Sequence, residues 1–230
     1  MNIPGLITVK PDQTNLLDKL SHMVGTSFLE ERWYITWLEA LDAQGIDPIR
    51  KQIITQAAIR GDYQATAPYG CILTVPDHTA AVNVYRKSEL VDLPWSGLQE
   101  QAAGVLEAVL THEEQQLLLE RIEEMEPISG SDWPLQVAHP EDDFLYIISI
   151  GVDSLQRGTG AFGRLFKPFL AYADDQELDC YLDCYSDQLE QLYNHYGFEI
   201  IERKSDPAFA VHERCMGRRP QPNPLTIAKK

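Results

Sequence analysis

A glycine-rich segment that contains one arginine carries the clearest chemical signal in this sequence. It reads Gln156-Arg157-Gly158-Thr159-Gly160-Ala161-Phe162-Gly163 and lies between an apolar run and a helical pattern. Unpaired backbone N–H groups at a helix start attract anions, and the helix dipole adds positive potential. Glycines let the backbone approach a phosphate without a Cβ in the way, and Arg157 adds a charged donor. The segment therefore predicts a site for a phosphate-bearing ligand.

The same segment also spells Gly-x-Gly-x-x-Gly, the pattern of many dinucleotide-binding proteins. Asp183 follows Gly158 by about twenty-five positions, close to where that fold has a ribose-binding acid. In that fold, however, the first glycine comes almost directly after the strand, whereas residues 153–157 intervene here, and too little chain remains after Tyr185 for further strand–helix units. An ATP-binding P-loop would need a following Gly-Lys-Ser or Gly-Lys-Thr. We therefore disfavour both nucleotide-binding interpretations.

The residues around this segment predict alternating strands and helices. Phe144–Val152 (FLYIISIGV) is a dense run of β-branched and aromatic residues, typical of a buried strand. The elements predicted after it are a helix from about Ala161 to Gln176, a strand over Asp179–Tyr185, a short helix over Leu189–His195, and strands over Gly197–Glu202 and Phe209–Met216. This order predicts an α/β protein built on a mixed sheet.

The N-terminal half has more helical signal. Apolar spacing and breaker residues predict a strand over Leu6–Val9, helices over Thr14–Val24, Glu30–Ala43 and Pro48–Arg60, a hairpin of Tyr69–Val75 with Thr79–Tyr85, a loop over Leu93–Gly97 and a helix over Leu98–Leu110. Gly25 and Gly61 are interpreted as helix stops. This helical section could cover a binding pocket, or its apolar side chains could simply form part of the hydrophobic core.

A further helix is predicted after Thr111. Thr111 and Glu114 have the spacing of a capping box. Its inward stripe is predicted to be Leu118, Ile122 and Met125. Its acidic residues, Glu113, Glu114, Glu120, Glu123 and Glu124, are expected to form a solvated face.

The charge balance narrows the range of partners. The formal net charge is −16 and the pI is about 4.7, which argues against nucleic acid because phosphate backbones attract Lys and Arg. A negative field favours cationic ligands such as amines, although acidity also simply keeps a protein in solution. The last twenty residues are basic, with Arg214, Arg218, Arg219, Lys229 and Lys230.

Four cysteines, Cys71, Cys180, Cys184 and Cys215, do not have the spacing of metal ligands. They are expected to be buried free thiols of a reducing compartment, and no metal is expected. We find no signal peptide in Met1–Pro11 and no apolar run of about eighteen residues, so neither a secretory route nor a membrane partner is expected. The expected location is the cytoplasm.

Two motifs together resemble the GNAT superfamily of acyl-CoA-dependent N-acetyltransferases. The first is the strand ending in Ile150-Gly151-Val152, followed by Leu155-Gln156-Arg157-Gly158-Thr159-Gly160, similar to the family's Gln/Arg-x-x-Gly-x-Gly/Ala loop. The second is Leu192-Tyr193-Asn194-His195-Tyr196-Gly197-Phe198, which looks like the family's Leu-Tyr-x-x-x-Gly-Phe. The resemblance covers Phe144–Met216, whereas residues 1–130 match only in outline.

The resemblance implies acetyl-CoA as co-substrate and a role for each matching residue. The pyrophosphate would lie on the loop N–H groups, and the pantetheine arm would pair with the strand end. The implied cofactor-binding residues are Ile150, Gly151, Val152, Arg157, Gly158, Thr159, Gly160, Ala161, Phe162 and Gly163. Tyr193 falls on the family's general acid, which protonates the departing thiolate; the alternative for Tyr193 is plain packing in the core.

One residue departs from the pattern, and one role has no clear occupant. Phe162 stands where the motif has a small residue, so its ring either faces the pyrophosphate or turns into the core. The proton acceptor for the amine is not identified. The acidic and basic candidates beside the buried strand are His139, Glu141, Asp142, Asp143 and Tyr146, each of which fits a surface or packing role better.

The resemblance implies a GNAT-like mixed, mostly antiparallel central sheet flanked by helices, with a helical section in the N-terminal half. We expect a single domain over residues 1–230, with an acceptor side in 1–130, an acetyl-CoA-binding half in 144–217 and a basic tail in 218–230. The implied function is transfer of an acetyl group to a primary amine, of a small molecule or a peptide, by direct attack. The alternative is a non-catalytic acyl-CoA-binding protein on the same fold. The acceptor and the oligomeric state are left open.

Overall fold

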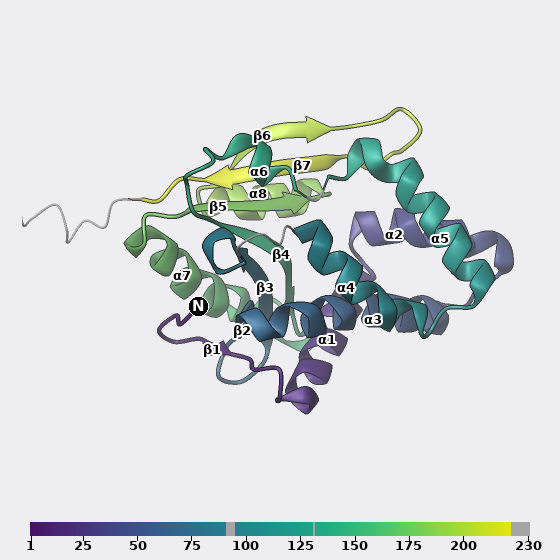
Figure 1. The fold of residues 1–230 in the computed structure, drawn as a ribbon, viewed down its shortest axis with the longest axis horizontal. Helices are drawn as coiled ribbons and strands as arrows, with labels where there is room; N and C mark the ends of the chain where they lie inside the picture. Colours follow the sequence, from purple (N-terminus) through teal and green to yellow (C-terminus); the bar gives the residue numbers. More distant parts are fainter. Residues whose placement is uncertain (91–94, 131, 222–230) are drawn as a thin grey trace, which may run out of the picture.

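A single seven-stranded sheet forms the centre of the molecule (Figure 1). The computed structural model describes residues 1–90, 95–130 and 132–221. Within these ranges the strand order is β1-β2-β3-β4-β5-β7-β6, and β4 with β5 is the only parallel pair. The strands are β1 Ile7–Thr8, β2 Ile72–Thr74, β3 Ala80–Arg86, β4 Phe144–Val152, β5 Asp179–Cys184, β6 Glu199–Lys204 and β7 Glu213–Arg218. The predicted mixed, mostly antiparallel sheet is confirmed, and a doubly wound dinucleotide-binding sheet is excluded.

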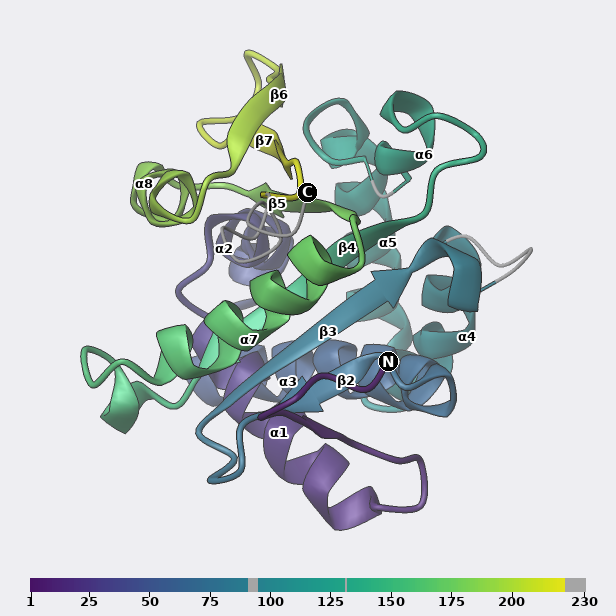
Figure 2. The ribbon, with the colours of Figure 1, turned by 90° about the vertical axis from the view of Figure 1, so that its left-hand side faces the viewer.

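Helices cover both faces of this sheet. In Figure 2, α7 crosses the near face in front of β3, while α1 and α3 lie behind. The helices are α1 Thr14–Phe28, α2 Arg32–Leu38, α3 Pro48–Thr66, α4 Trp95–Glu107, α5 His112–Met125, α6 Pro134–Val137, α7 Ala161–Asp175 and α8 Asp187–His195. Both faces of β4 are therefore covered, which explains its nearly continuous apolar sequence.

Two predicted helix ends are wrong. Gly25 and Gly61 lie inside α1 and α3, which continue past them. A Cβ on Gly25 would lie 2.8 Å from Cα of Gln56, and one on Gly61 would lie 2.5 Å from the carbonyl oxygen of Ala102. Because glycine has no side chain, α1 can pack closely against α3 at Gly25, and α3 can pack closely against α4 at Gly61.

Three other boundaries also differ. The helix expected over Glu30–Ala43 is shorter, because α2 passes into a 3₁₀ turn over Glu39–Gln44 that ends at Gly45. The loop expected over Leu93–Gly97 lies partly outside the described residues, and α4 already begins at Trp95. Strand β7 extends to Arg218, so this residue belongs to the sheet and not to the tail, and it pairs with Asp174 at 2.7 Å. Residues 222–230 of the predicted basic tail lie outside the described part.

The capping box at the start of α5 is confirmed, but two expectations on its faces are wrong. Ile122 is 42% exposed, so it does not belong to the inward stripe. Glu114 is 5% exposed instead of solvated, because its carboxylate also binds Arg50 of α3. That ion pair, together with the cap, lowers the pKa of Glu114 to about 2. It attaches α5 to α3.

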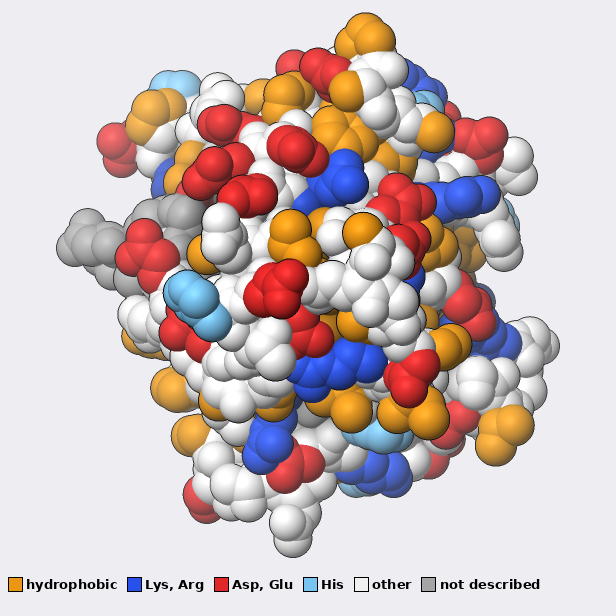
Figure 3. All heavy atoms as spheres, turned by 90° about the vertical axis from the view of Figure 1, so that its right-hand side faces the viewer, with side chains coloured by type: hydrophobic (Ala, Val, Ile, Leu, Met, Phe, Trp, Pro, Cys, Tyr) orange, Lys and Arg blue, Asp and Glu red, His pale blue; other side chains and the backbone are white. Residues whose placement is uncertain are grey.

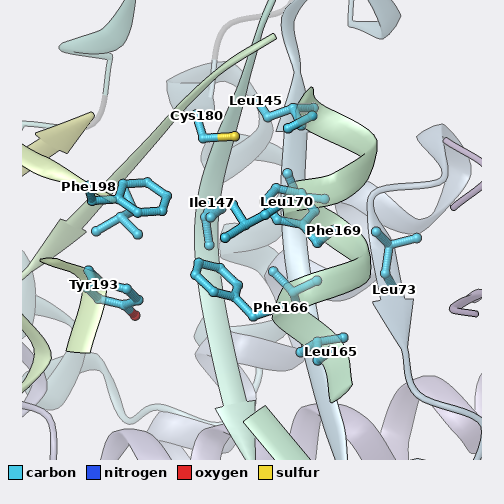
Figure 4. Close-up of a cluster of buried hydrophobic side chains, with 14 of the residues drawn as sticks. Leu73, Leu145, Ile147, Leu165, Phe166, Phe169, Leu170, Cys180, Tyr193 and Phe198 are labelled. Atoms are coloured by element: carbon cyan, nitrogen blue, oxygen red, sulfur yellow. The ribbon is translucent and has the colours of Figure 1, made fainter. Parts of the chain in front are cut away.

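The main core lies between α7 and the sheet. Figure 4 shows Phe166 and Phe169 of α7 together with Ile147 of β4, Phe198 and Tyr193 in this cluster, in which the rings of Phe198 and Tyr193 both pack against Phe166. All four cysteines are buried free thiols, as expected. On the face in Figure 3, acidic and basic side chains are interspersed, so the negative charge is not gathered there into one patch. Among the described residues, no helix is long and apolar enough to span a membrane.

Candidate active site

The strands β4 and β5 separate halfway along β4. Their parallel pairing covers only Phe144–Ile147, whereas the pairing of β4 with β3 continues to Val152. A bulge opposite Asn83 and Val84 leaves Ile148 out of register at the point of separation. Beyond Ile147, the edge of β4 that faces β5 has no strand partner within the described ranges. This edge offers free backbone donors and acceptors to a ligand.

A cleft of about 2440 Å³ opens at this separation. Its lining includes the free end of β4, the glycine-rich loop, α8, and the turn between α1 and α2. Pockets for one small molecule measure about 300–1,000 Å³, so this cleft has room for a long cofactor together with a second ligand.

The glycine-rich loop forms one end of the cleft. Gly158 and Gly160 have φ values of 77° and 85°, in the left-handed region that favours glycine, and Gly160 is the N-cap of α7. The N–H groups of Ala161, Phe162 and Gly163 follow in the first turn and make no hydrogen bond to another described residue. Free N–H groups at a helix start are the arrangement on which the predicted anion site depends.

The ring of Phe162 turns into the core, which decides between the two orientations considered for it. Its centroid lies 4.8 Å from that of Phe166 and 5.6 Å from that of Tyr196. The ring therefore packs between α7 and α8, and the backbone N–H of Phe162 stays in the first turn of the helix.

Arg157 of the loop and Arg164 in the first turn of α7 are each paired with an acid from another segment. Arg157 lies 2.6 Å from Glu30 in the turn after α1, and Arg164 lies 2.9 Å from Asp77 in the β2–β3 hairpin. All four side chains are substantially exposed, so these pairs are weak and can exchange partners.

Tyr193 of α8 lines the cleft and is 4% exposed. Its ring packs 6.0 Å from that of Phe198 and 6.1 Å from that of Phe166 (Figure 4). Burial raises the pKa of its hydroxyl, and nearby Cys184 adds to this effect. Tyr193 therefore keeps its proton at neutral pH. These contacts give the ring of Tyr193 a packing role. The hydroxyl is the part of the side chain that could take part in a reaction.

A pair of acids, half-buried Asp183 and buried Glu213, also lines the cleft, and the sequence did not identify it as a pair. Asp183 projects from β5 and Glu213 begins β7, and their carboxylate oxygens lie within 4.8 Å of each other. Tyr146 and the indole N–H of Trp133 both donate to Asp183. Burial, and then Glu213, raise the pKa of Asp183 well above its usual value.

Glu213 is held by three donors. It accepts hydrogen bonds from Tyr185 at 3.0 Å and from the N–H of Gly130 at 3.2 Å, and Lys204 lies 3.1 Å away. The sequence signal for the pair is one acid within the apolar strand, at Asp183, which was considered only as a ribose-binding residue. Glu213 had no signal, because its role depends on the pairing of β5 with β7.

The earlier candidates for a proton acceptor are not at the cleft, apart from Tyr146. His139, Glu141, Asp142 and Asp143 do not line it. Asp143 instead binds Arg86 at 2.8 Å and the N–H of Ser88 at 2.9 Å. Tyr146 lines the cleft as a donor to Asp183.

Two further acids, Glu31 and Asp62, line the cleft from the side of the N-terminal helices. Burial raises the pKa of each to about 7. Neither makes an ion pair with another described residue. Glu31 has Arg32 beside it, which opposes this increase, whereas burial is the single cause for Asp62. The burial of Asp62 is therefore the more costly for the fold.

The stability of the protein should therefore rise when Asp62 is replaced by asparagine. A carboxyl whose folded pKa is about 7 binds more protons in the folded state than in the unfolded state, so its cost develops as the pH rises from about 4 to 7. We expect Asp62→Asn to raise the melting temperature by about 5 °C at pH 8 and by little at pH 4.5. Thermal unfolding at both pH values measures this, with the exposed Asp18→Asn as control. A lower melting temperature at pH 8 would contradict an unpaired carboxylate.

Comparisons with known proteins identify the fold. No family model matches the chain, and no curated protein sequence matches it. A solved acetyltransferase from Corynebacterium glutamicum, described as histone acetyltransferase and related acetyltransferase, aligns with a TM-score of 0.53 and 15% identity over 97% of this chain and 99% of its own. Arylalkylamine N-acetyltransferase 2 from Aedes aegypti aligns with a TM-score of 0.51 and 15% identity over 96% and 100%. The chain therefore has the GNAT fold that its motifs resemble.

Proposed function

We propose that this protein is an N-acetyltransferase that uses acetyl-CoA to acetylate a primary amine. The observation that carries the proposal is the separation of β4 from β5, which opens a cleft lined by the glycine-rich helix start and by the acid pair Asp183 and Glu213. The shared fold supports it, since the similar structures are acetyltransferases by name. The four buried free thiols support the expected cytoplasmic location.

The chain's own residues fit acetyl-CoA. The free edge of Ile150, Gly151 and Val152 offers backbone groups to the amides of a pantetheine arm, in the manner of an added strand. The free N–H groups of Ala161, Phe162 and Gly163 suit a pyrophosphate, and Arg157 can leave Glu30 to join them. Acetyl-CoA supplies the acetyl group as a thioester. The amine nitrogen forms a bond to the carbonyl carbon, the bond from that carbon to sulfur breaks, and CoA leaves as a thiol with net release of one proton.

The acid pair Asp183 and Glu213 can take up the proton that the amine must lose. An ammonium beside Asp183 favours the carboxylate form of that residue, which then accepts the proton. The raised pKa of Asp183 makes it a stronger base than an ordinary carboxylate. Tyr146 and Trp133 hold its two oxygens in place. Tyr193, which keeps its proton, donates it to the leaving sulfur.

Two measurements test the proposal together. Calorimetry should show binding of CoA, and release of free thiol from acetyl-CoA should depend on an added amine. A non-catalytic acyl-CoA-binding protein would bind CoA and release no thiol with any amine in the panel. A protein that binds no CoA would refute both interpretations.

Arg157 and Glu30 provide a pair of variants with opposite expected effects. Arg157→Gln removes a charged hydrogen bond to the pyrophosphate and should weaken CoA binding about tenfold. Glu30→Gln frees Arg157 and should tighten binding about twofold, as expected for the loss of an exposed ion pair. Arg203→Gln is the matched control, because Arg203 is 44% exposed, like Arg157, and also pairs with an acid. Equal effects of Arg157→Gln and Arg203→Gln on the Kd for CoA would show that Arg157 does not bind the pyrophosphate.

A further inference from the structure

A lysine of the edge strand, Lys204, provides a positive charge to the acid pair Asp183 and Glu213. Lys204 is the last residue of β6 and lies directly opposite Glu213 in the antiparallel pairing of β6 with β7. Its ammonium nitrogen lies 3.1 Å from Oε2 of Glu213, and the two side chains are 20% and 1% exposed. Water and salt screen a pair of this kind much less than an ion pair on the surface. Within the described chain, no other Lys or Arg forms an ion pair with either acid.

The segment before α6 leaves room for this lysine. Gly130 has no side chain, and a Cβ at its position would overlap the ammonium nitrogen of Lys204. The N–H of Gly130 also donates to Glu213 at 3.2 Å, and the hydroxyl of Tyr185 donates to it at 3.0 Å. One cation and two neutral donors therefore stabilise Glu213 as a carboxylate.

Asp183 has a different environment. Its two oxygens accept hydrogen bonds from the indole N–H of Trp133 and the hydroxyl of Tyr146, which are both neutral donors. On β7, Cys215 lies opposite Asp183, so Glu213 is its diagonal neighbour on the same face of the sheet. The carboxylate oxygens of the two acids lie within 4.8 Å of each other, where two negative charges repel. The position of the cation therefore decides which of the two acids carries a proton.

The other titratable groups near the pair add no positive charge. They come from β4, β5, β6, β7 and the start of α2, and are Tyr146, Tyr185, Glu202, Cys215 and Glu31. Burial raises the pKa of both tyrosines and of the cysteine, so these three groups stay neutral. Burial by itself lowers the pKa of Lys204, but Glu213 outweighs this effect and raises that pKa above its usual value. Lys204 therefore stays charged.

We propose that Lys204 is a positioning residue of the reaction, which keeps Glu213 ionised so that the proton of the amine goes to Asp183. This proposal rests on the proposed acetyl transfer and goes beyond it by naming the group that sets its pH range. In the proton-transfer step, an N–H bond of the attacking amine breaks and an O–H bond forms on Asp183, while Glu213 and Lys204 keep their charges. Lys204 does not line the cleft, so it acts through Glu213 and not on the substrate.

The pH dependence of kcat/KM for amine acetylation tests this role. Lys204→Gln removes the cation that stabilises the doubly ionised pair, so the rising limb should move to higher pH by about one unit or more. Glu213→Gln removes the negative charge beside Asp183, so the limb should move to lower pH by about one unit. Lys204→Arg keeps the positive charge and should keep the limb of the wild type.

A second lysine gives the matched control. Lys51 is 27% exposed, similar to Lys204, and pairs with Asp42, and neither residue lines the cleft. Lys51→Gln should leave the limb unchanged. A merely structural role would lower the rate at all pH values alike and would not produce opposite shifts in Lys204→Gln and Glu213→Gln. An unchanged limb in Lys204→Gln, or the same shift in Lys204→Arg, would overturn the proposal.

Carbon-13 NMR of the side-chain carboxyl groups separates this proposal from acetyl transfer, because it requires no activity. Asp183→Asn and Glu213→Gln assign the two signals by their loss. In the wild type, Glu213 should remain a carboxylate over the pH range in which Asp183 takes up its proton, a result that does not depend on the folding of Lys204→Gln. If this pattern is found without any acetylation, the role of Lys204 stands and only acetyl transfer is refuted. If Glu213 takes up the proton first, the role of Lys204 is refuted, whatever the activity.

Discussion

Replacing Asp183 with asparagine is expected to lower kcat/KM for amine acetylation by about 10²- to 10⁴-fold, the usual contribution of a general base. The substitution preserves the shape of the side chain, and Tyr146 can turn its hydroxyl to accept from the new amide, so the local contacts remain. The KM for acetyl-CoA should stay within about twofold, because Asp183 is not one of the residues expected to hold the cofactor. Steady-state kinetics with both substrates measure this.

The pH dependence distinguishes a base from a structural acid. Asp183 must be ionised to accept a proton, and its pKa is raised by burial and by Glu213. Activity of the wild type should therefore rise with pH through a limb well above the usual range of a carboxyl, and Asp183→Asn should lose that limb. Asp179→Asn, on the same strand but bound to Tyr181, serves as control. If the limb and kcat/KM are unchanged in Asp183→Asn, the proton acceptor lies elsewhere.

Replacing Tyr193 with phenylalanine is expected to lower kcat by about 10²-fold or more, since the leaving thiolate loses its proton donor. The ring that packs against Phe166 and Phe198 is retained, so the melting temperature should change little. Single-turnover thiol release measures the chemical step directly, without product dissociation.

A neighbouring tyrosine gives the matched control. Tyr196 also lines the cleft and packs against Phe162 and Phe166, but it is more exposed than Tyr193. Tyr196→Phe should keep kcat within about threefold, because its hydroxyl has no role in protonating the sulfur. An unchanged kcat in Tyr193→Phe would leave Tyr193 with the packing role alone.

The errors in the sequence-based prediction have a common cause. A glycine within a helical pattern can end the helix or admit a neighbouring helix, and local spacing is the same in both cases. Gly25 and Gly61 are of the second kind, since Gln56 and Ala102 approach them too closely for a Cβ. Glu114 was assigned to solvent for a similar reason, because its partner Arg50 lies 64 positions away in the chain. Each depends on a contact between helices that only the folded chain creates.

The glycine-rich loop, the buried strand Phe144–Val152 and the order of elements after it were determined by the sequence alone. Their causes are local: backbone freedom at Gly158 and Gly160, side-chain periodicity, and the free N–H groups of a helix start. The end of the β4–β5 pairing at Ile147 and the approach of Glu213 to Asp183 were decided only by the tertiary structure. The reason is that both arise between segments distant in sequence, where the register of one strand against another decides which side chains meet.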